Sequence, residues 1–142
     1  MDIHPLTDDL SVSPQLRTED LPVLAARGFR SVINNRPDGE EPDQPTSAAL
    51  AQAAAAAGLA YRHLPVVSGQ VQDAEVEAFM KLLDELPAPV LAFCRTGTRS
   101  TTLWALGMAR RLGAQAVLAQ AKAAGYDLSA LAPRLAEAER QR

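Results

Sequence analysis

The sequence contains one cysteine, few aromatic residues and no excess of positive charge. A single cysteine, Cys94, excludes an internal disulfide framework and a zinc or iron–sulfur site built from several cysteines of one chain. Lys and Arg number 14 against 17 Asp and Glu, which gives a net charge of -3. Because a broad nucleic-acid-binding face needs clustered basic residues, we predict no nucleic-acid partner. Any anion-binding site must be local.

Long apolar runs and clusters of metal ligands are also missing. Residues 1–5 lack the basic and apolar regions of a signal peptide, and no later stretch approaches the ~20 apolar residues that cross a bilayer. The sequence therefore predicts a cytoplasmic protein without membrane contact. His4 and His63 lie far apart in sequence, and Cys94 has no partner at zinc spacing. We predict neither a metal ion nor an organic cofactor.

The 142 residues, 47% of them hydrophobic, suffice for one compact domain over residues 1–142. Aromatic residues make up only 4%, so Ala, Leu and Val must fill the core. Apolar periodicity and the Gly and Pro positions predict strands at 31–33, 61–64 and 89–93. The expected helices lie within 18–28, 46–57, 73–86, 100–112, 115–124 and 127–140. Such alternation predicts an α/β fold of three layers, a mainly parallel sheet of about four to five strands with helices on both faces.

The segment Cys94 to Ser100 carries the chemistry, because it lies between an apolar strand and a helix start. A turn around a helix N-terminus points backbone N–H groups inward, and the helix dipole adds partial positive charge. These groups hold an oxyanion and favour a thiolate over a thiol, so Cys94 is the expected nucleophile. Arg99 can clamp two oxygens of a tetrahedral anion with its planar guanidinium. The expected substrate-binding residues are the rest of the loop: Arg95, Thr96, Gly97, Thr98 and Ser100.

A simpler interpretation is that Cys94 is a buried apolar residue at the end of a strand and that the arginines are solvated. Two arginines, a glycine and three hydroxyl groups within six residues of the cysteine favour the oxyanion site instead. The hydroxyl of Ser100 or Thr101 could also donate to the sulfur, and the sequence does not distinguish them.

The sequence resembles the phosphatase-like domain of the beta-lactamase-hydrolase-like proteins, a bacterial family related to tyrosine and dual-specificity phosphatases. The resemblance spans most of the chain and rests on residues 12–16, 28–34, 36–41, 89–91 and 94–100. It implies a tyrosine- or dual-specificity-phosphatase-like α/β fold with Cys94 as nucleophile and Arg99 as the anion clamp.

The active loop departs from the phosphatase pattern in its length. Tyrosine-phosphatase-like enzymes place five residues between the cysteine and the arginine, whereas only four residues, 95–98, separate Cys94 from Arg99. That length and the spelling Cys-Arg-x-Gly-x-Arg are similar to the active loop of rhodanese-type sulfurtransferases. The residue before the nucleophile, commonly histidine in phosphatases, is Phe93 here.

The general acid of a phosphatase is also missing from its usual place. In related phosphatases an aspartate follows the strand that ends in a proline like Pro65, but residues 66–69 are Val-Val-Ser-Gly here. Asp38 is the best substitute as a general acid, although a turn residue in Pro-Asp-Gly is an equally good interpretation. Asp73 is expected to cap a helix, His63 to be structural and Trp104 to lie in the core. Two glutamates, Glu40 and Glu41, are expected to be solvated or to pair with Arg36 or Arg95.

These features favour a rhodanese-type sulfurtransferase, since sulfite leaves thiosulfate without a proton. Cys94 would carry the sulfane sulfur as a persulfide, with thiosulfate or glutathione persulfide as substrate and a persulfide dioxygenase as a candidate functional partner. The alternative is a cysteine-dependent phosphatase with a phosphocysteine intermediate. A second alternative is a non-catalytic module that binds oxyanions or senses redox state through its thiol.

Overall fold

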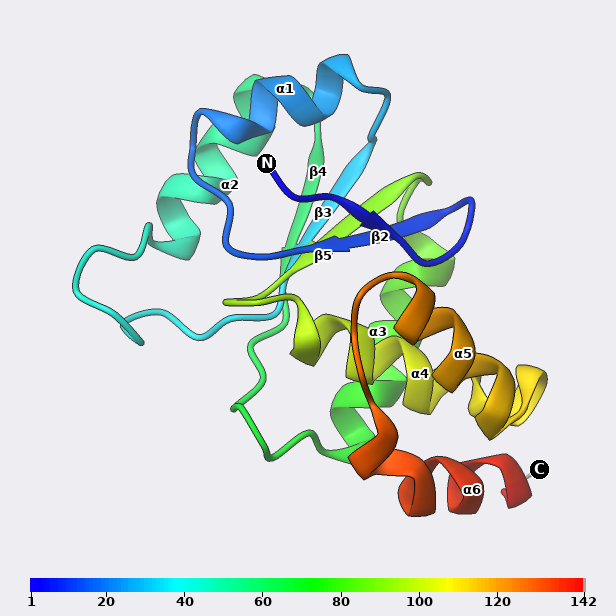
Figure 1. The fold of residues 1–142 in the computed structure, drawn as a ribbon. Helices are drawn as coiled ribbons and strands as arrows, with labels where there is room; N and C mark the ends of the chain where they lie inside the picture. The colour runs from blue at the N-terminus through cyan, green and yellow to red at the C-terminus, as the bar shows by residue number, and fades with distance from the viewer. Residues whose placement is uncertain (142) are drawn as a thin grey trace.

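The sheet of the computed structural model, which describes residues 1–141, has the strand order β1-β2-β5-β3-β4 (Figure 1). The short edge strand β1 runs antiparallel to β2, and the other neighbouring strands are parallel. This arrangement confirms the predicted mainly parallel sheet of an α/β domain. The strands are β1 (His4–Pro5), β2 (Leu10–Ser13), β3 (Ser31–Asn34), β4 (Ala60–His63) and β5 (Val90–Phe93).

Helices cover both faces of this sheet, as the sequence predicts (Figure 1). In β5, Leu91 and Phe93 pack with α1 and α2, whereas Val90 and Ala92 face the cluster that includes the later helices. The alternation follows from the two-residue period of a strand. The helices are α1 (Asp20–Ala26), α2 (Ser47–Ala56), α3 (Asp73–Glu85), α4 (Thr98–Leu112), α5 (Ala114–Ala123) and α6 (Ala132–Arg140), with a 3-10 turn, η1, at Ser129–Leu131.

Strand β5 lies at the centre of the sheet and is buried along its whole length. Its neighbours β2 and β3 run in the same direction, so three loops meet at the carboxyl ends of these strands. Backbone hydrogen bonds tie the loops together, because Gln15 N donates to Arg95 O and Asn35 N donates to Phe93 O. Residues from three distant parts of the sequence therefore surround Cys94, which follows β5 directly.

Three details of the expected fold are corrected by the structure. The sequence did not indicate the strands β1 and β2, because their apolar runs are short. The helix expected over 127–140 begins later, since η1 and α6 occupy only 129–140. Asp73 is the first residue of α3, and the cap is Gln72, whose N–H donates to Glu75 Oε1 at 2.7 Å. None of the helices within residues 1–141 has the length and apolar character that crossing a bilayer requires.

Candidate active site

The loop after β5 curls around the sulfur of Cys94. Gly97 adopts a left-handed conformation with φ of +96°, which a residue with a Cβ adopts only at a cost. This conformation directs the Gly97 N–H toward Cys94 Sγ at 3.1 Å. Because α4 begins at Thr98, the positive end of its dipole lies at the same place. The thiol itself is buried and forms the floor of the loop.

Tyr126 covers the outer side of the loop, and no local sequence pattern indicates this contact. Its hydroxyl donates to Thr96 O at 3.0 Å, and a Cβ at Gly97 would collide with that hydroxyl. Burial, followed by the negative charge of Cys94, raises the pKa of Tyr126 to about 12. The phenol therefore remains a hydrogen-bond donor at neutral pH, and it fixes the direction of the Thr96 carbonyl.

Arg99 lies beside the thiol with part of its guanidinium already bound. Nη1 donates to Glu40 Oε2 at 2.8 Å and to Val66 O at 2.9 Å, and Nη2 donates to Glu40 Oε1 at 2.9 Å. A guanidinium has five N–H groups, so Nε–H and one N–H of Nη2 remain. Hydrogen bonding to Glu40 raises the pKa of Arg99, and the charge of Cys94 adds to this effect. The edge formed by Nε and Nη2 is therefore suited to two oxygens of a tetrahedral anion.

Glu40 holds two buried arginines at once. Its Oε1 also accepts from Arg36 Nε at 2.7 Å, so the carboxylate receives charge-assisted hydrogen bonds from both Arg36 and Arg99. The hydrogen bond from Arg99, followed by that from Arg36, lowers the pKa of Glu40 from its ordinary 4.5 to about 2. The expectation that Glu40 can pair with Arg36 is confirmed, and its contact with Arg99 is a finding of the structure.

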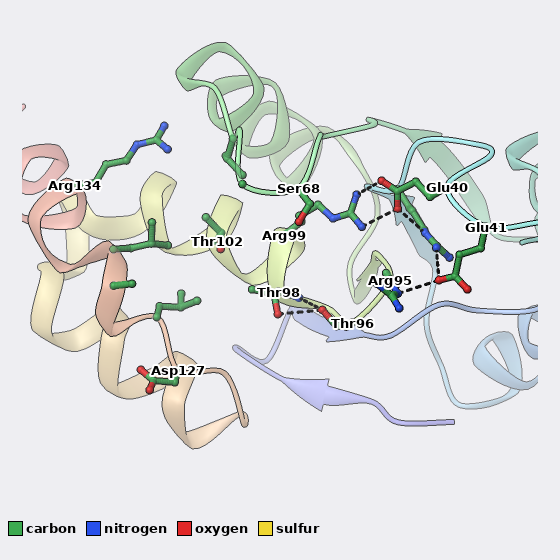
Figure 2. Close-up of a pocket in the computed structure, with 16 residues that line it drawn as sticks. Glu40, Glu41, Ser68, Arg95, Thr96, Thr98, Arg99, Thr102, Asp127 and Arg134 are labelled. Carbon is green, nitrogen blue, oxygen red and sulfur yellow. Dashed lines mark hydrogen bonds and ion pairs between the residues drawn. The ribbon is translucent and has the colours of Figure 1, made fainter.

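A second carboxylate, Glu41, extends this network to the surface. Glu41 Oε1 accepts from Arg36 Nη2 and from Arg95 Nε, both at 2.9 Å. Gln15 completes the contacts of Arg36 by accepting from Nη1 at 3.0 Å. Figure 2 shows Glu41 and Arg95 at one end of the pocket, beyond the pair of Arg99 and Glu40. The loops after β2, β3 and β5 are thus cross-linked around the active loop.

The pocket above this network has a volume of about 560 Å³. Four residues of the active loop line it: Arg95, Thr96, Thr98 and Arg99. Cys94 and Gly97 do not line it, since the thiol lies beneath the loop and Tyr126 covers the glycine. The arginines of the loop therefore face the pocket, whereas Cys94 has no exposed surface.

Ser100 lies behind the loop and is fully buried. Its hydroxyl donates to Asn35 Oδ1 at 2.8 Å, and the hydroxyl of Thr101 donates to Gly97 O at 2.8 Å. A hydroxyl has one O–H to donate, so neither supplies a hydrogen bond to the sulfur. Both hydroxyls that could have donated to the sulfur are therefore directed to other acceptors. Asn35, which the sequence did not single out, instead anchors the start of α4 to β3.

Asp38 lies between Arg36 and Glu40 in the sequence, but its side chain is directed toward α2. Its Oδ1 accepts from Ser47 N at 2.8 Å, which places the carboxylate at the start of α2. Asp38 is not among the residues that line the pocket. His63 is structural, as expected, because its Nε2 contacts Arg36 O at 2.8 Å. Trp104 is only 2% exposed and belongs to the core, as expected.

The carboxylates that do line the pocket are poor proton donors. Glu40 has a pKa of about 2, and Glu41 is paired with two arginines. Asp127 accepts the backbone N–H of Ser129, and this hydrogen bond lowers the pKa of Asp127. At neutral pH the carboxylates of Glu40 and Asp127 therefore have no proton to give, and both contacts of Glu41 are with cations. Val66 to Gly69 provide no carboxyl group either.

The fold is that of a cysteine-based phosphatase-like domain. Its cysteine follows the central parallel strand, the next loop leads into a helix, and an arginine lies in the first turn of that helix. Solved structures agree with this class. Tk-PTP in its active form has a TM-score of 0.74 at 18% identity, over 99% of this chain and 98% of that one. TpbA of P. aeruginosa has a TM-score of 0.68 at 20% identity, over 98% and 91%. At these identities the similarity shows the fold alone.

The particular family follows from closer similarity. Residues 2–111 match the model of the phosphatase-like domain of beta-lactamase hydrolase-like proteins, and the chain belongs to this family. A beta-lactamase hydrolase-like protein of Agrobacterium fabrum is 39% identical over 127 residues, 88% of this chain and 30% of that protein. A candidate phosphatase crystallised from Neisseria meningitidis is 38% identical with a TM-score of 0.89, over 97% of this chain and 99% of that one.

These relationships confirm the resemblance found in the sequence and shift the functional hypothesis. The candidate phosphatase from Neisseria meningitidis, at 38% identity, favours the phosphatase alternative over the sulfurtransferase that the sequence favoured. The chain spans about a third of the length of the curated relatives it matches. What the remainder of those relatives does is therefore not carried over to this chain.

Proposed function

We propose that this domain is a cysteine-dependent phosphatase whose substrates are phosphate monoesters with leaving groups that depart without a proton. The Cys94 thiolate attacks phosphorus, the ester P–O bond breaks, and its electron pair leaves with the alcohol or phenol oxygen. Water then attacks the phosphocysteine, the P–S bond breaks, and orthophosphate leaves as the thiolate is restored. The proton of the attacking water passes to solvent.

The observation that carries this proposal is the arrangement of Arg99. Glu40 and Val66 O engage one end of its guanidinium, and the edge formed by Nε and Nη2 is left for an oxyanion. Because a fixed cation beside the nucleophile stabilises charge that develops on the equatorial oxygens, the arrangement suits phosphoryl transfer. Similarity to the candidate phosphatase from Neisseria meningitidis, at 38% identity, supports the same reaction class.

The restriction to activated leaving groups comes from the missing proton donor. A general acid typically contributes ~10²–10⁴-fold to such a reaction. Glu40 and Asp127 have lowered pKa values and hold no proton at neutral pH, and Asp38 is engaged at α2. Leaving groups of low basicity lose the least from this absence.

Sulfur transfer is the second candidate, and the four-residue spacing between Cys94 and Arg99 favours it. The thiolate would attack the sulfane sulfur of thiosulfate, and the S–S bond would break with its electrons on sulfite. The resulting Cys94 persulfide would then pass its outer sulfur to cyanide or to a thiolate, which restores the Cys94 thiolate. Glutathione persulfide as substrate and a persulfide dioxygenase as functional partner belong to this candidate.

A parallel assay of both reactions tests the proposal. The wild-type protein is incubated with a series of aryl phosphates of increasing leaving-group basicity and, separately, with thiosulfate and cyanide. We expect phosphate release that depends on Cys94 and falls steeply as the leaving group becomes more basic. Thiocyanate formation without phosphate release would refute the phosphatase and support the second candidate. Binding of both anions without any product would instead support a non-catalytic module.

A further inference from the structure

The pocket is much larger than the anion it is proposed to hold. A tetrahedral oxyanion displaces only a few water molecules of ~30 Å³ each, whereas the pocket measures about 560 Å³. Pockets of ~300–1,000 Å³ are typical of sites that enclose an organic ligand. The volume beyond the active loop is therefore available to the body of the substrate.

The lining of this additional volume is apolar. Val71 lies before α3, and the segment that leads into α6 contributes the other apolar side chains. Facing them on α4, Thr98 and Thr102 are one helical turn apart, about 6 Å. The apolar residues that line the pocket are Val71, Leu128, Ala130 and Leu131.

Arg134 closes the end of the pocket away from the active loop. Figure 2 shows it at the opposite side from Arg95 and Glu41, with Thr102 and Arg99 between them. Its Nη2 pairs with Asp73 Oδ1 at 2.9 Å, but the Asp73 side chain is 91% exposed. Ion pairs of this kind contribute little because water competes for both partners. Arg134 is thus a cation that lines the pocket, and another anion can replace Asp73 as its partner.

The carboxylates that line the pocket do not pair with Arg134. Glu40 and Glu41 are engaged by Arg36, Arg95 and Arg99 at the far end. Asp127 lines the pocket too, but its carboxylate accepts Ser129 N at 2.9 Å, and Figure 2 shows it well apart from Arg134. The pocket therefore has a cation at each end and an apolar section between them.

We propose that this pocket selects an elongated substrate: a reactive oxyanion at Arg99, an apolar body against Leu128 and Leu131, and a carboxylate at its other end that pairs with Arg134. The inference rests on the proposed function for the reactive end. The distal carboxylate takes the place of Asp73 as the partner of Arg134, and Asp73, which is 91% exposed, returns to water.

Two matched probes test the inference: a nitrophenyl phosphate whose ring carries a propanoate arm, and the same ester with a propanamide arm. The two have similar leaving groups and shapes and differ in the distal charge. We expect kcat/KM at neutral pH to be about fivefold higher for the propanoate, the size expected of a partly exposed charge-assisted hydrogen bond. In Arg134→Gln this ratio falls to near one, and Arg134→Lys retains part of it.

Arg140→Gln is the matched control, because Arg140 lies on the same helix and pairs with Glu137 outside this pocket. It should retain the wild-type ratio, and thermal unfolding confirms that each variant is folded. Asp73→Asn should raise the ratio, since it removes the competing carboxylate. No preference in the wild type, or an unchanged preference in Arg134→Gln, would overturn the inference.

Calorimetric binding of both probes to Cys94→Ser separates this inference from the proposed function. A preference for the propanoate that depends on Arg134, without turnover by the wild type, leaves the pocket assignment standing and refutes the phosphatase. Turnover of both probes at equal efficiency, together with equal affinity, refutes the pocket assignment and leaves the phosphatase standing.

Discussion

Replacement of Glu40 by Gln removes the charge that holds Arg36 and Arg99 in place. Both arginines are almost fully buried, at 3% and 7% exposure, and Glu40 accepts hydrogen bonds of 2.7 to 2.9 Å from them. A glutamine has one oxygen to accept and an NH₂ that faces the cations unfavourably. The variant Glu40→Gln should therefore lose stability and disorder the guanidinium of Arg99.

The size of the loss follows from the pKa of Glu40. Its fall from 4.5 to about 2 corresponds, at ~1.4 kcal/mol per pKa unit, to an upper limit of ~3 kcal/mol. The Glu40 side chain is 27% exposed, so solvent screening reduces this to about 1–2 kcal/mol. Because the folded-state pKa is depressed, this contribution is complete above pH 4.5 and disappears as the pH falls toward 2.

Urea unfolding of the wild type and of Glu40→Gln at several pH values measures this contribution. We expect the wild type to be more stable by about 1–2 kcal/mol at pH 7 and the difference to shrink as the pH falls below 4.5. The matched control is Glu77→Gln, which changes an exposed acid on α3 that takes no part in the capping of that helix. Equal stability of wild type and Glu40→Gln at pH 7, or a difference that does not depend on pH, would refute the reasoning.

Three further substitutions test the loop and its surroundings. Gly97→Ala should lower the melting temperature and nearly abolish turnover, because alanine strains at φ of +96° and collides with the Tyr126 hydroxyl. Tyr126→Phe should reduce kcat/KM about five- to tenfold by releasing the Thr96 carbonyl, with a smaller loss of stability, ~1 kcal/mol, in thermal unfolding. Asp38→Asn should keep turnover within about twofold of the wild type in a steady-state assay, because the side chain faces α2 rather than the pocket. A collapse of turnover would instead identify Asp38 as the general acid.

Much of the fold could be predicted from local sequence signals. Val90 to Phe93 form an uninterrupted apolar run, which is typical of a strand covered on both faces, and the run is the central strand β5. Gly and Pro residues mark the ends of the elements around it. The edge strand β1 left no comparable signal, since His4–Pro5 is too short for an alternating pattern and pairs only with β2.

The position of the active loop could also be predicted, but the side chains from other elements that contact it could not. The residues from Cys94 to Arg99 are consecutive, so a local motif is enough to identify the loop. Glu40, Asn35 and Tyr126 reach the loop through hydrogen bonds with Arg99, Ser100 and Thr96, respectively. The partners in these bonds lie 30 to 65 residues apart in the sequence. Such contacts depend on strand order and helix packing, and neither is encoded in a local pattern.

The misjudged role of Ser100 has the same cause. A hydroxyl beside a nucleophile in sequence is a reasonable donor to it, but α4 turns Ser100 toward β3, where Asn35 accepts its proton. The choice of acceptor depends on the direction of the side chain along the helix, which only the packed structure defines.

The role of Cys94 as nucleophile is tested by the intact mass of the protein, quenched during turnover of an activated aryl phosphate. We expect one phosphoryl adduct on the wild type, located at Cys94 by peptide mapping and absent from Cys94→Ser. A parallel sample with thiosulfate shows whether a sulfur atom is captured instead. Equal labelling of wild type and Cys94→Ser, or no adduct from either compound during turnover, would contradict the claim that Cys94 is the nucleophile.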